Sequence, residues 1–525
     1  MKRRQLLTGL AGASAGTLLS PGLRALAQTS AGAGTLTFGQ STPVLTLDPA
    51  HGTFTGYPGG YEAALCLYDR LLDFDAEMNI SPELAESFKM ADDLLSATLK
   101  LRAGLRFHDG TPCDGAAVRL NLERLMDKGR NPTNRPLWDP LAGVETPDAL
   151  TVVIRLRTPF SQLPNSLAHG SGAMVSPAAI EKFGDTGIAQ HPIGAGPFKM
   201  TSFTPGQELV VEAFDQYWGG KPATAKIVFR AIAEPATRLS ALRTGAVDVI
   251  DAVPVALIGP LKGDPNLTII AKPGLRPMGF VINLSHEPLD DPRIRQALNL
   301  AVPVEAIAEK VFFGYARAPD SPLAFNTAGH HSAGKLAFDQ AKAKVLLAEA
   351  GFGAAKPLKL SLFTPEGLFP NDVSVSEIVA NSLKQVGADV AITKIEGGAY
   401  WDALRQDRAN LKWDLAMFGF NPSNASGLYH LASLFKSNAD DAARPDVWNI
   451  GRYRNPKVDA LLVQADRTGD KAQQDALLAQ VQEMVWTDNP YIWLQVNENI
   501  SAARKSVKGV EVWPIVFTSL RHASA

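Results

Sequence analysis

The chain has few of the features that mark several large classes of protein. It has two cysteines among 525 residues, so it is not a disulfide-rich secreted scaffold. Its 51 basic and 53 acidic residues nearly balance, which argues against the concentrated basic face that a nucleic-acid partner requires. No Cys and His spacing resembles a metal site, and neither a metal nor a cofactor is expected. No apolar run after the N-terminal segment is long enough to span a bilayer.

The two cysteines leave two possibilities open. An oxidising compartment would permit a bridge between Cys66 and Cys113. Cys66 lies in an apolar, helix-like run and Cys113 lies beside a turn, a setting that favours two buried free thiols. The sequence cannot place their Cα atoms, and a disulfide has strict distance limits.

The N-terminus has the pattern of an export signal. Arg3-Arg4-Gln5-Leu6-Leu7 resembles a twin-arginine motif, and an Ala/Gly-rich run follows through Leu19. Ala25-Leu26-Ala27 is a small-x-small cleavage site, so residues 1–27 are predicted to be a signal peptide. Removal of this segment takes away four basic residues and no acidic one. No cysteine follows the cleavage site, so a lipid anchor is not expected. A soluble periplasmic protein is expected; an ordinary secretory signal with a chance arginine pair is the alternative.

Common catalytic motifs are missing from the chain beyond residue 27. There is no Gly-x-Ser-x-Gly nucleophile elbow, no His-Glu-x-x-His and no phosphate-binding Gly-x-x-x-x-Gly-Lys-Ser/Thr. His330-His331 is a histidine pair in a loop, and adjacent side chains point apart, so a shared metal is not expected. The chain is therefore predicted not to be an enzyme.

Strand-like runs alternate with punctuated helices, which predicts an α/β protein. Asp291, Asp339 and Asn455 each stand where a helix N-cap is expected, and Gly351 can end the helix that Asp339 begins. The predicted strands are 150–156, 227–232, 268–271, 278–283, 358–363, 390–394 and 491–496.

The segment from Leu101 to Pro112 is the most informative motif. Leu101, Leu105 and Phe107 are apolar strand positions, and Asp109-Gly110 is typical of a tight turn. Asp114 can then cap a helix that runs through Met126. From the residues alone, this is a structural strand, turn and helix.

As a string, however, 101–112 resembles a signature of solute-binding protein family 5, the extracytoplasmic subunits of peptide, nickel and related ABC importers. Seven further motifs, before and after this segment, stand in that family's order. They are Leu47-Asp48-Pro49, Tyr68-Asp69-Arg70-Leu71-Leu72, Pro82-Glu83-Leu84-Ala85-Glu86-Ser87-Phe88, Gly194-Ala195-Gly196-Pro197-Phe198, Tyr217-Trp218-Gly219-Gly220-Lys221-Pro222, Asp291-Pro292-Arg293-Ile294-Arg295-Gln296-Ala297-Leu298 and Tyr453-Arg454-Asn455-Pro456-Lys457-Val458-Asp459.

The resemblance implies a two-lobe periplasmic-binding-protein fold of the large type. Lobe I would comprise 28–272 and 492–525, with an extra subdomain at about 65–180, and lobe II would comprise 275–490. Pro273-Gly274 and Asn489-Pro490 would join the lobes as a hinge. Such a protein, expected to be a monomer, binds a small molecule or peptide between its lobes and passes it to membrane permease subunits. His108, in the turn motif, is then expected to be structural.

The resemblance also suggests which loops line the cleft. In lobe I these include Phe54, Thr55 and Tyr57, and the stretch with His169 and Ser171, whose neighbouring glycines would admit a ligand. In lobe II, Phe369 and Asn371 follow a strand, and Trp401 is either core or a ligand platform. A plain surface loop is the alternative for the lobe I stretches.

The segment from Trp413 to Ser426, which is predicted to be a buried strand that runs into a polar loop, is the most diagnostic. Peptide-binding members of the family carry an aspartate there for the peptide ammonium group, but no acid occurs between Asp414 and Asp440. Neutral groups suit a polar or anionic ligand better than a buried ammonium. The loop's candidate ligand-binding residues are Phe420, Asn421, Ser423, Asn424 and Ser426.

These residues favour a modified or acidic peptide, such as a glutathione-like compound, or an opine-like conjugate. Ordinary di- or oligopeptides and a nickel chelate remain alternatives. From other classes, a secreted hydrolase and a periplasmic sensor or chaperone also remain open.

Overall fold

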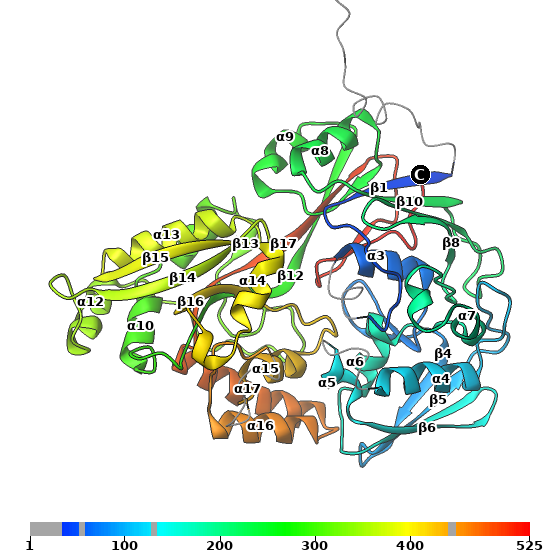
Figure 1. The fold of residues 1–525 in the computed structure, drawn as a ribbon, viewed down its shortest axis with the longest axis horizontal. Helices are drawn as coiled ribbons and strands as arrows, with labels where there is room; N and C mark the ends of the chain where they lie inside the picture. Colours follow the sequence, from blue (N-terminus) through cyan, green and yellow to red (C-terminus); the bar gives the residue numbers. More distant parts are fainter. Residues whose placement is uncertain (1–33, 52–57, 128–133, 439–447) are drawn as a thin grey trace, which may run out of the picture.

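The computed structural model describes residues 34–51, 58–127, 134–438 and 448–525. Two masses lie side by side, and the long strands β12 (Leu267–Ile282) and β17 (Tyr491–Arg504) run through both (Figure 1). Around these two strands the described residues form one sheet of eleven strands, in the order β15-β14-β16-β12-β17-β11-β1-β10-β9-β8, with β13 paired to β17. The predicted α/β class is confirmed.

The part of the sheet on the right in Figure 1 belongs to the first lobe. Its strands are β1 (Thr35–Gln40), β8 (Phe198–Thr204), β9 (Glu208–Ala213), β10 (Lys226–Ala231) and β11 (Val249–Ile250). Its helices are α3 (Pro58–Leu67), α5 (Arg135–Trp138), α6 (Leu163–Ala168), α7 (Pro177–Phe183), α8 (Pro235–Thr244) and α9 (Ile258–Lys262). Two small hairpins complete it, β2 (Leu72–Phe74) with β3 (Ile80–Pro82), and β18 (Glu511–Val512) with β19 (Thr518–Ser519).

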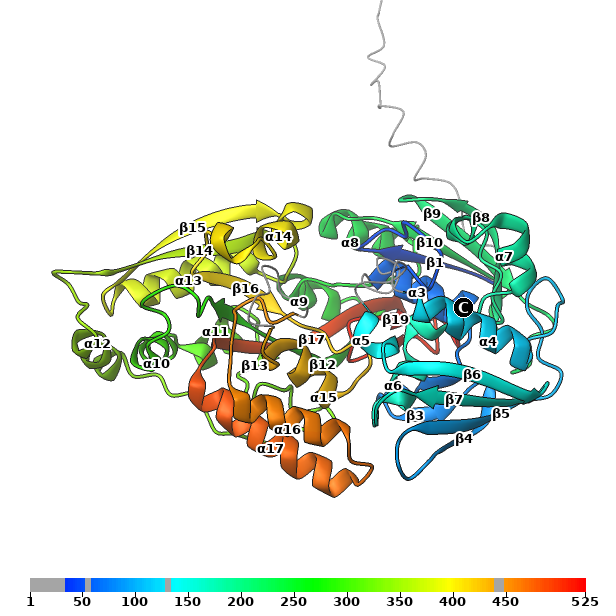
Figure 2. The same ribbon diagram turned by 60° about the horizontal axis from the view of Figure 1, so that its bottom comes forward.

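A second, antiparallel sheet forms an additional layer of the first lobe. Its strands are β4 (Ala85–Met90), β5 (Ser96–Leu101), β6 (Leu141–Asp148) and β7 (Thr151–Leu156), in the order β4-β5-β7-β6. Helix α4 (Gly115–Met126) lies against this sheet (Figure 2). Asp114 caps α4 as the sequence predicts, because its carboxylate accepts the Ala117 N–H.

The second lobe contains β14 (Leu358–Glu366), β15 (Ala388–Glu396), β16 (Leu415–Gly419) and the short β13 (Ala316–Arg317). Its apolar core lies between this sheet and the buried faces of α10 and α13. The helices are α10 (Pro292–Leu300), α11 (Val304–Lys310), α12 (Gln340–Glu349), α13 (Asp372–Lys384), α14 (Gly397–Leu404), α15 (Gly427–Phe435), α16 (Pro456–Asp466) and α17 (Lys471–Asp488).

The sequence prediction of two separate strands, 268–271 and 278–283, is wrong. Pro273 and Pro277 lie inside the single strand β12, which pairs with β17 on both sides of a register shift between these prolines. A bulge of this kind tolerates residues that cannot donate to the ladder. The same pairing carries β17 from Tyr491, beside the second lobe, to Arg504, beside β11.

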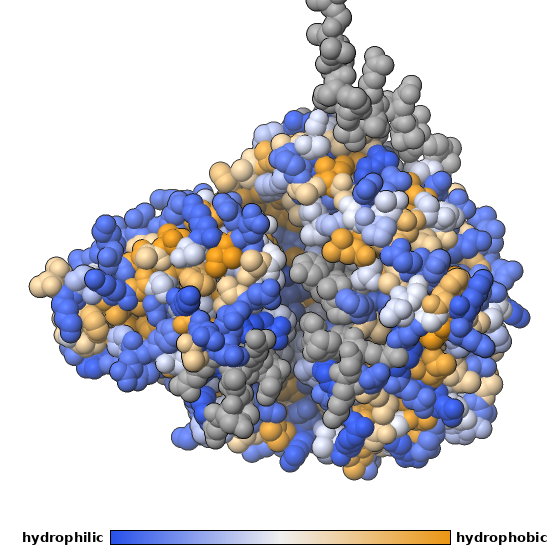
Figure 3. All heavy atoms as spheres, viewed as in Figure 1, coloured by the Kyte–Doolittle hydropathy of each residue, from blue (hydrophilic) through white to orange (hydrophobic). Residues whose placement is uncertain are grey.

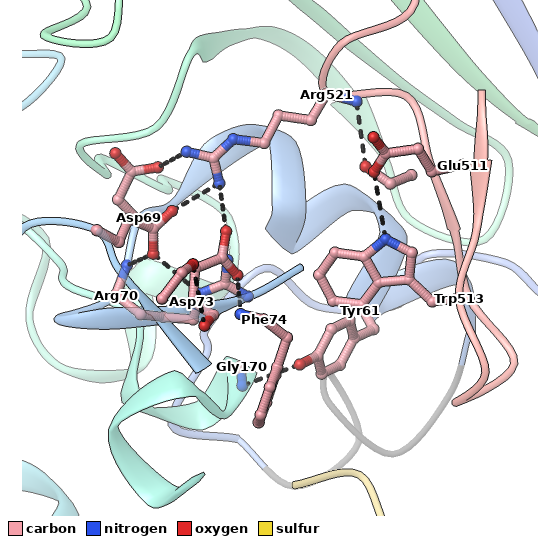
Figure 4. Close-up of polar contacts among 12 residues, drawn as sticks. Tyr61, Asp69, Arg70, Asp73, Phe74, Gly170, Glu511, Trp513 and Arg521 are labelled. Carbon is pink, nitrogen blue, oxygen red and sulfur yellow. Dashed lines mark hydrogen bonds and ion pairs between the residues drawn. The ribbon is translucent and has the colours of Figure 1, made fainter. Parts of the chain in front are cut away.

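Several motifs that carry the family resemblance meet in one buried ionic cluster of the first lobe (Figure 4). Arg521, near the C-terminus, lies 2.7 Å from both the Asp69 and Glu83 carboxylates, and Arg70 also pairs with Glu83 and with Asp73. Although burial pushes the Glu83 pKa up, the two guanidinium groups hold it below its usual value. These motif residues therefore join distant parts of the chain.

The turn motif is structural as well. His108 is buried, with Nε2 3.0 Å from the Gly196 carbonyl, and the Gly194 N–H donates to its Nδ1. Burial lowers the His108 pKa to about 4, so the ring is neutral. A Cβ on Gly194 would lie 2.1 Å from the Leu67 carbonyl, so this close approach requires glycine.

No described helix combines the length and the apolar character needed to cross a membrane. Cys66 and Cys113 are both free and buried, as favoured by their sequence setting. His330 and His331 bond to different acids, Asp320 and Glu483, and among the described residues no cluster of three potential ligands could hold a metal ion.

Candidate functional site

The parallel strands of the second lobe bring two loops to the same edge of the sheet. β14 pairs in parallel with both β15 and β16, so the carboxyl ends of these strands lie together. Residues 367–371 follow β14, and residues 420–426 follow β16. Ligands of α/β proteins bind at the carboxyl ends of such strands. On the face shown in Figure 3, the surface is hollowed between the two lobes.

Loop 420–426 touches the first lobe, and three of its hydrogen bonds reach the stretch 162–169. His169 Nε2 lies 2.9 Å from Ser423 Oγ. Asn165 Nδ2 donates to the Asn424 carbonyl at 2.9 Å, and Ser426 Oγ donates to Gln162 Oε1 at 2.9 Å. The structure thus brings together His169, Ser423, Asn424 and Ser426 from opposite lobes.

The tautomer of His169 follows from its partners. Its Nδ1 accepts the Ser171 N–H at 3.1 Å, so the ring proton is on Nε2 and is donated to Ser423. Burial, and then the Arg70 charge, lower the His169 pKa to about 3. The imidazole is therefore a neutral donor across the lobe contact throughout the physiological range. Ser171 Oγ also accepts the Trp138 indole N–H at 3.0 Å, and this hydrogen bond holds the segment 169–171 against α5.

Tyr61 supports the His169 loop from beneath (Figure 4). Its hydroxyl accepts the Gly170 N–H at 3.2 Å, and its ring stacks on Phe517 with centroids 4.1 Å apart. The segment that contains Phe517 also meets the second lobe, because Asn421 Nδ2 donates to the Ile515 carbonyl at 2.7 Å. A predicted site residue of the second lobe therefore touches the C-terminal segment.

Aromatic side chains gather beside loop 420–426, in a group that we call the aromatic cluster: Phe369, Trp401, Phe418, Phe420 and Trp448. Trp401 is at its centre, with ring centroids 5.8–6.3 Å from those of Trp448, Phe418 and Phe369. Phe420 lies 6.0 Å from Trp448. Trp401 and Trp448 keep partial exposure, whereas Phe420 is 9% exposed. Trp401 thus combines core contacts with an open face.

The remaining predicted residues have more local roles or lie outside the described part. Asn371 is exposed and adopts a left-handed conformation (φ 56°) before α13. Its Nδ2 makes a long hydrogen bond of 3.4 Å to the Val311 carbonyl. Ser426 also caps α15 by accepting the Tyr429 N–H. Phe54, Thr55 and Tyr57 lie outside the described residues.

Sequence reasoning missed Arg276 on β12. Its Cδ would lie 3.0 Å from a Cβ on Gly419, the last residue of β16, and its Cζ lies 5.8 Å from the Phe369 ring centroid. Arg276 therefore lies where both loops begin. A lone cation within the apolar run 275–282, next to a predicted hinge, is the signal that could have identified it.

Comparisons with known proteins agree with this architecture. A family model described as bacterial extracellular solute-binding proteins, family 5 middle, matches residues 79–442. The glutathione-binding protein GsiB of Pectobacterium atrosepticum is 31% identical over 467 residues, which cover 88% of each chain.

Two solved structures resemble the chain over most of its length. AgaA of A. tumefaciens R10, in complex with agropinic acid, is 26% identical, with a TM-score of 0.77 over 93% of this chain and 96% of that one. NikZ of Campylobacter jejuni, in complex with Ni(L-His), is 22% identical, with a TM-score of 0.81 over 94% and 100%. The latter likeness concerns the fold alone.

The match to the family model covers more than half of the chain, and the relative above 30% identity covers most of it. Two lobes joined by paired strands are also the architecture that the family resemblance predicts. Members of this family bind solutes outside the cytoplasm for ABC importers and do not catalyse reactions on them. The chain belongs to the bacterial extracellular solute-binding proteins of family 5.

Proposed function

We propose that this substrate-binding subunit captures a small polar solute that carries a carboxylate. Two kinds of solute meet this description: a modified or acidic peptide of the glutathione type, and an opine-like conjugate. The similarity to a glutathione-binding protein, at 31% identity, and to an opine-acid complex, at 26% identity, supports both.

The observation that carries the proposal is the neutrality of loop 420–426. This loop reaches the opposite lobe through Ser423 and Ser426, so it is well placed to close over a solute. It offers amides and hydroxyls and no carboxylate. Burying a peptide ammonium against such groups costs several kcal/mol, whereas an anionic solute meets donors such as the buried Asn424 Nδ2, which has no partner among the described residues.

Binding would act through closure of the two lobes. A solute that touches both lobes favours the closed state by its differential affinity for it. Lobe I (28–272 and 492–525) would rotate against lobe II (275–490) at the register shift of β12, where the ladder is already interrupted. The candidate ligand-binding residues of the loops would then meet the solute from both sides.

Delivery to the periplasm would follow from the N-terminal segment. Arg3 and Arg4 would direct twin-arginine export, and cleavage after Ala27 would release a monomer that docks on its permease. The family's extracytoplasmic location is consistent with this route.

A titration panel tests the ligand class. Protein purified without refolding is first examined by native mass spectrometry for co-purified solute. Calorimetric titrations then use glutathione, agropinic acid and dialanine. We expect one of the two acids to bind, and dialanine, whose ammonium cancels its only carboxylate and leaves no net negative charge, to bind at least about 100-fold more weakly. Submicromolar binding of dialanine would overturn the proposed class in favour of ordinary peptides.

A further inference from the structure

Arg276 is a cation inside the hinge region, and no described residue forms a hydrogen bond or an ion pair with its guanidinium. It lies between Leu275, whose N–H donates to the Pro514 carbonyl, and Pro277, which pairs with Val496 of β17. Its Nε is buried without a partner, and no hydrogen bond or ion pair joins the guanidinium to any described residue.

The arginines that are buried elsewhere in the described chain all have partners. Arg70 meets Asp73 and Glu83, and Arg521 meets Asp69 and Glu83. Arg238 donates to four backbone carbonyls, and Arg295 donates to three. Leaving the buried Nε of Arg276 without an acceptor is costly, so its retention here calls for a partner that comes from elsewhere.

The surroundings of Arg276 define the chemistry of that partner. Its stem passes over Gly419, and its head faces the Phe369 ring of the aromatic cluster. Partial burial lowers its pKa to about 10, no acid of the described residues counteracts this, and the group stays cationic at neutral pH. A guanidinium presents parallel N–H donors in a rigid fork, which matches the two oxygens of a carboxylate.

We infer that Arg276 is the receptor for a carboxylate of the bound solute, at the hinge end of the cleft. This inference rests on the proposed function and adds the residue and the group that it binds. A phosphate-bearing solute offers similar oxygens, but the nearby aromatic cluster and amides favour an organic acid. The orphaned Oδ1 of Asn497, next to Val496 on β17, adds an acceptor for the amide or amino groups of such an acid.

The first test reads Arg276 directly and needs no knowledge of the natural solute. Protein labelled with ¹⁵N-arginine gives Nε–Hε signals, and Arg276→Lys identifies the signal of Arg276 by its loss. Sodium glutarate should shift this signal saturably in the wild type, and sodium chloride at equal ionic strength should not. A shift with phosphate and none with glutarate would overturn the carboxylate assignment, and no shift with either would overturn the site.

The second test measures affinity with glutathione as the probe. Arg276→Gln should weaken binding at least tenfold, and Arg276→Lys, which keeps the charge but loses the fork, should lie between this variant and the wild type. Lys272→Gln removes a charge from the same strand, at an exposed pair with Glu77, and should change affinity less than twofold. Thermal unfolding shows that each variant is folded, and Arg276→Gln should not lower the midpoint because it removes an unpaired charge.

The two proposals can fail separately. Unchanged glutathione affinity in Arg276→Gln would overturn the role of Arg276 and leave the proposed solute class standing. If neither glutathione nor agropinic acid binds the wild type while glutarate shifts the Arg276 signal, the carboxylate receptor stands and the two proposed solute types fall.

Discussion

The neutral imidazole of His169 in the first lobe donates its Nε2 proton to the Ser423 hydroxyl of the second lobe, 254 residues later. This contact is partly buried and uncharged, so its strength does not depend on salt in the way that a surface ion pair does. It links the lobe contact to a loop that is supported by Tyr61 and Trp138.

Ser423→Ala should loosen the closed state. The variant leaves the His169 N–H buried without an acceptor only when the lobes are together, at a cost of about 1–3 kcal/mol. We expect a larger radius of gyration by small-angle X-ray scattering and weaker glutathione binding. Ser202→Ala, at an exposed position of β8, is the control. An unchanged radius would mean that this hydrogen bond does not hold the lobes.

Ser423→Asp should raise the His169 pKa, which is about 3 in the wild type. The new carboxylate would face Nε2 and stabilise the imidazolium by about one to three pKa units. The new carboxylate would pair with His169 rather than with the ammonium group of a ligand. Histidine Cε1–H chemical shifts followed against pH measure the change, with His331 as the exposed internal reference. A titration that matches the wild type would contradict the lobe contact.

Asp466, which also joins the two lobes, should make the stability of the protein depend on pH. Burial raises its pKa from 3.8 to about 6, and its carboxylate accepts from Ser161 of the first lobe at 3.3 Å. The folded chain thus holds this proton to a higher pH than the unfolded chain, so the group lowers the free energy of unfolding as pH rises from about 4 to about 6. The full effect is up to about 3 kcal/mol, less a discount for partial exposure.

Chemical denaturation at several pH values tests this linkage. The difference in free energy of unfolding between Asp466→Asn and the wild type should shift in favour of the variant from pH 4 to pH 7. The reason is that the amide does not ionise, whereas the buried carboxyl must. Asp475→Asn, at an exposed pair with Lys471, should show no such trend. Parallel curves for Asp466→Asn and the wild type would argue against the raised pKa.

Phe420→Ala should cost more stability than affinity. The ring is 9% exposed and packs against Tyr429, His430 and Trp448, so truncation leaves a cavity worth about 3–5 kcal/mol. Trp401→Ala, at a partly exposed position, should instead lose more affinity for glutathione than stability. Thermal unfolding and calorimetry on both variants give the two quantities. A stable Phe420→Ala variant with strongly reduced affinity would instead place this ring on the solute.

The export prediction concerns Arg3 and Arg4. Replacing both with lysine keeps the charge but removes the guanidinium forks, and Arg and Lys are not equivalent where that geometry is read. The precursor of the double variant should remain in the cytoplasm. Cell fractionation and immunoblotting measure this, with Lys2→Arg as the control. Normal periplasmic yield would refute the twin-arginine route.

Local signals in the sequence predicted the start of several helices. Asp114, Asp291 and Asn455 each cap the expected helix, because a cap is satisfied by a backbone N–H within three residues. The continuity of β12 through Pro273 could not be predicted in this way. It depends on pairing with β17, more than 200 residues later in the chain.

The site was harder to predict because its residues act across the lobes. The sequence nominated His169 and Ser423 separately, but their contact depends on how the lobes meet. Arg276 was missed because its isolation is a three-dimensional property, namely that no acid from the described part of the chain pairs with it. Conversely, the motif residues Asp69 and Glu83, which carry the family resemblance, belong to a structural ionic cluster.

That cluster has a consequence for the order in which the protein can fold. Arg521 is the fifth residue from the C-terminus, and it neutralises carboxylates that are contributed by residues 69–83. While the chain is still attached to the ribosome, Asp69, Asp73 and Glu83 have Arg70 alone as a buried counter-ion in this cluster. The first lobe, although its synthesis begins first, therefore cannot complete this cluster until residue 521 has been made, and the second lobe, whose residues all precede it, can form earlier.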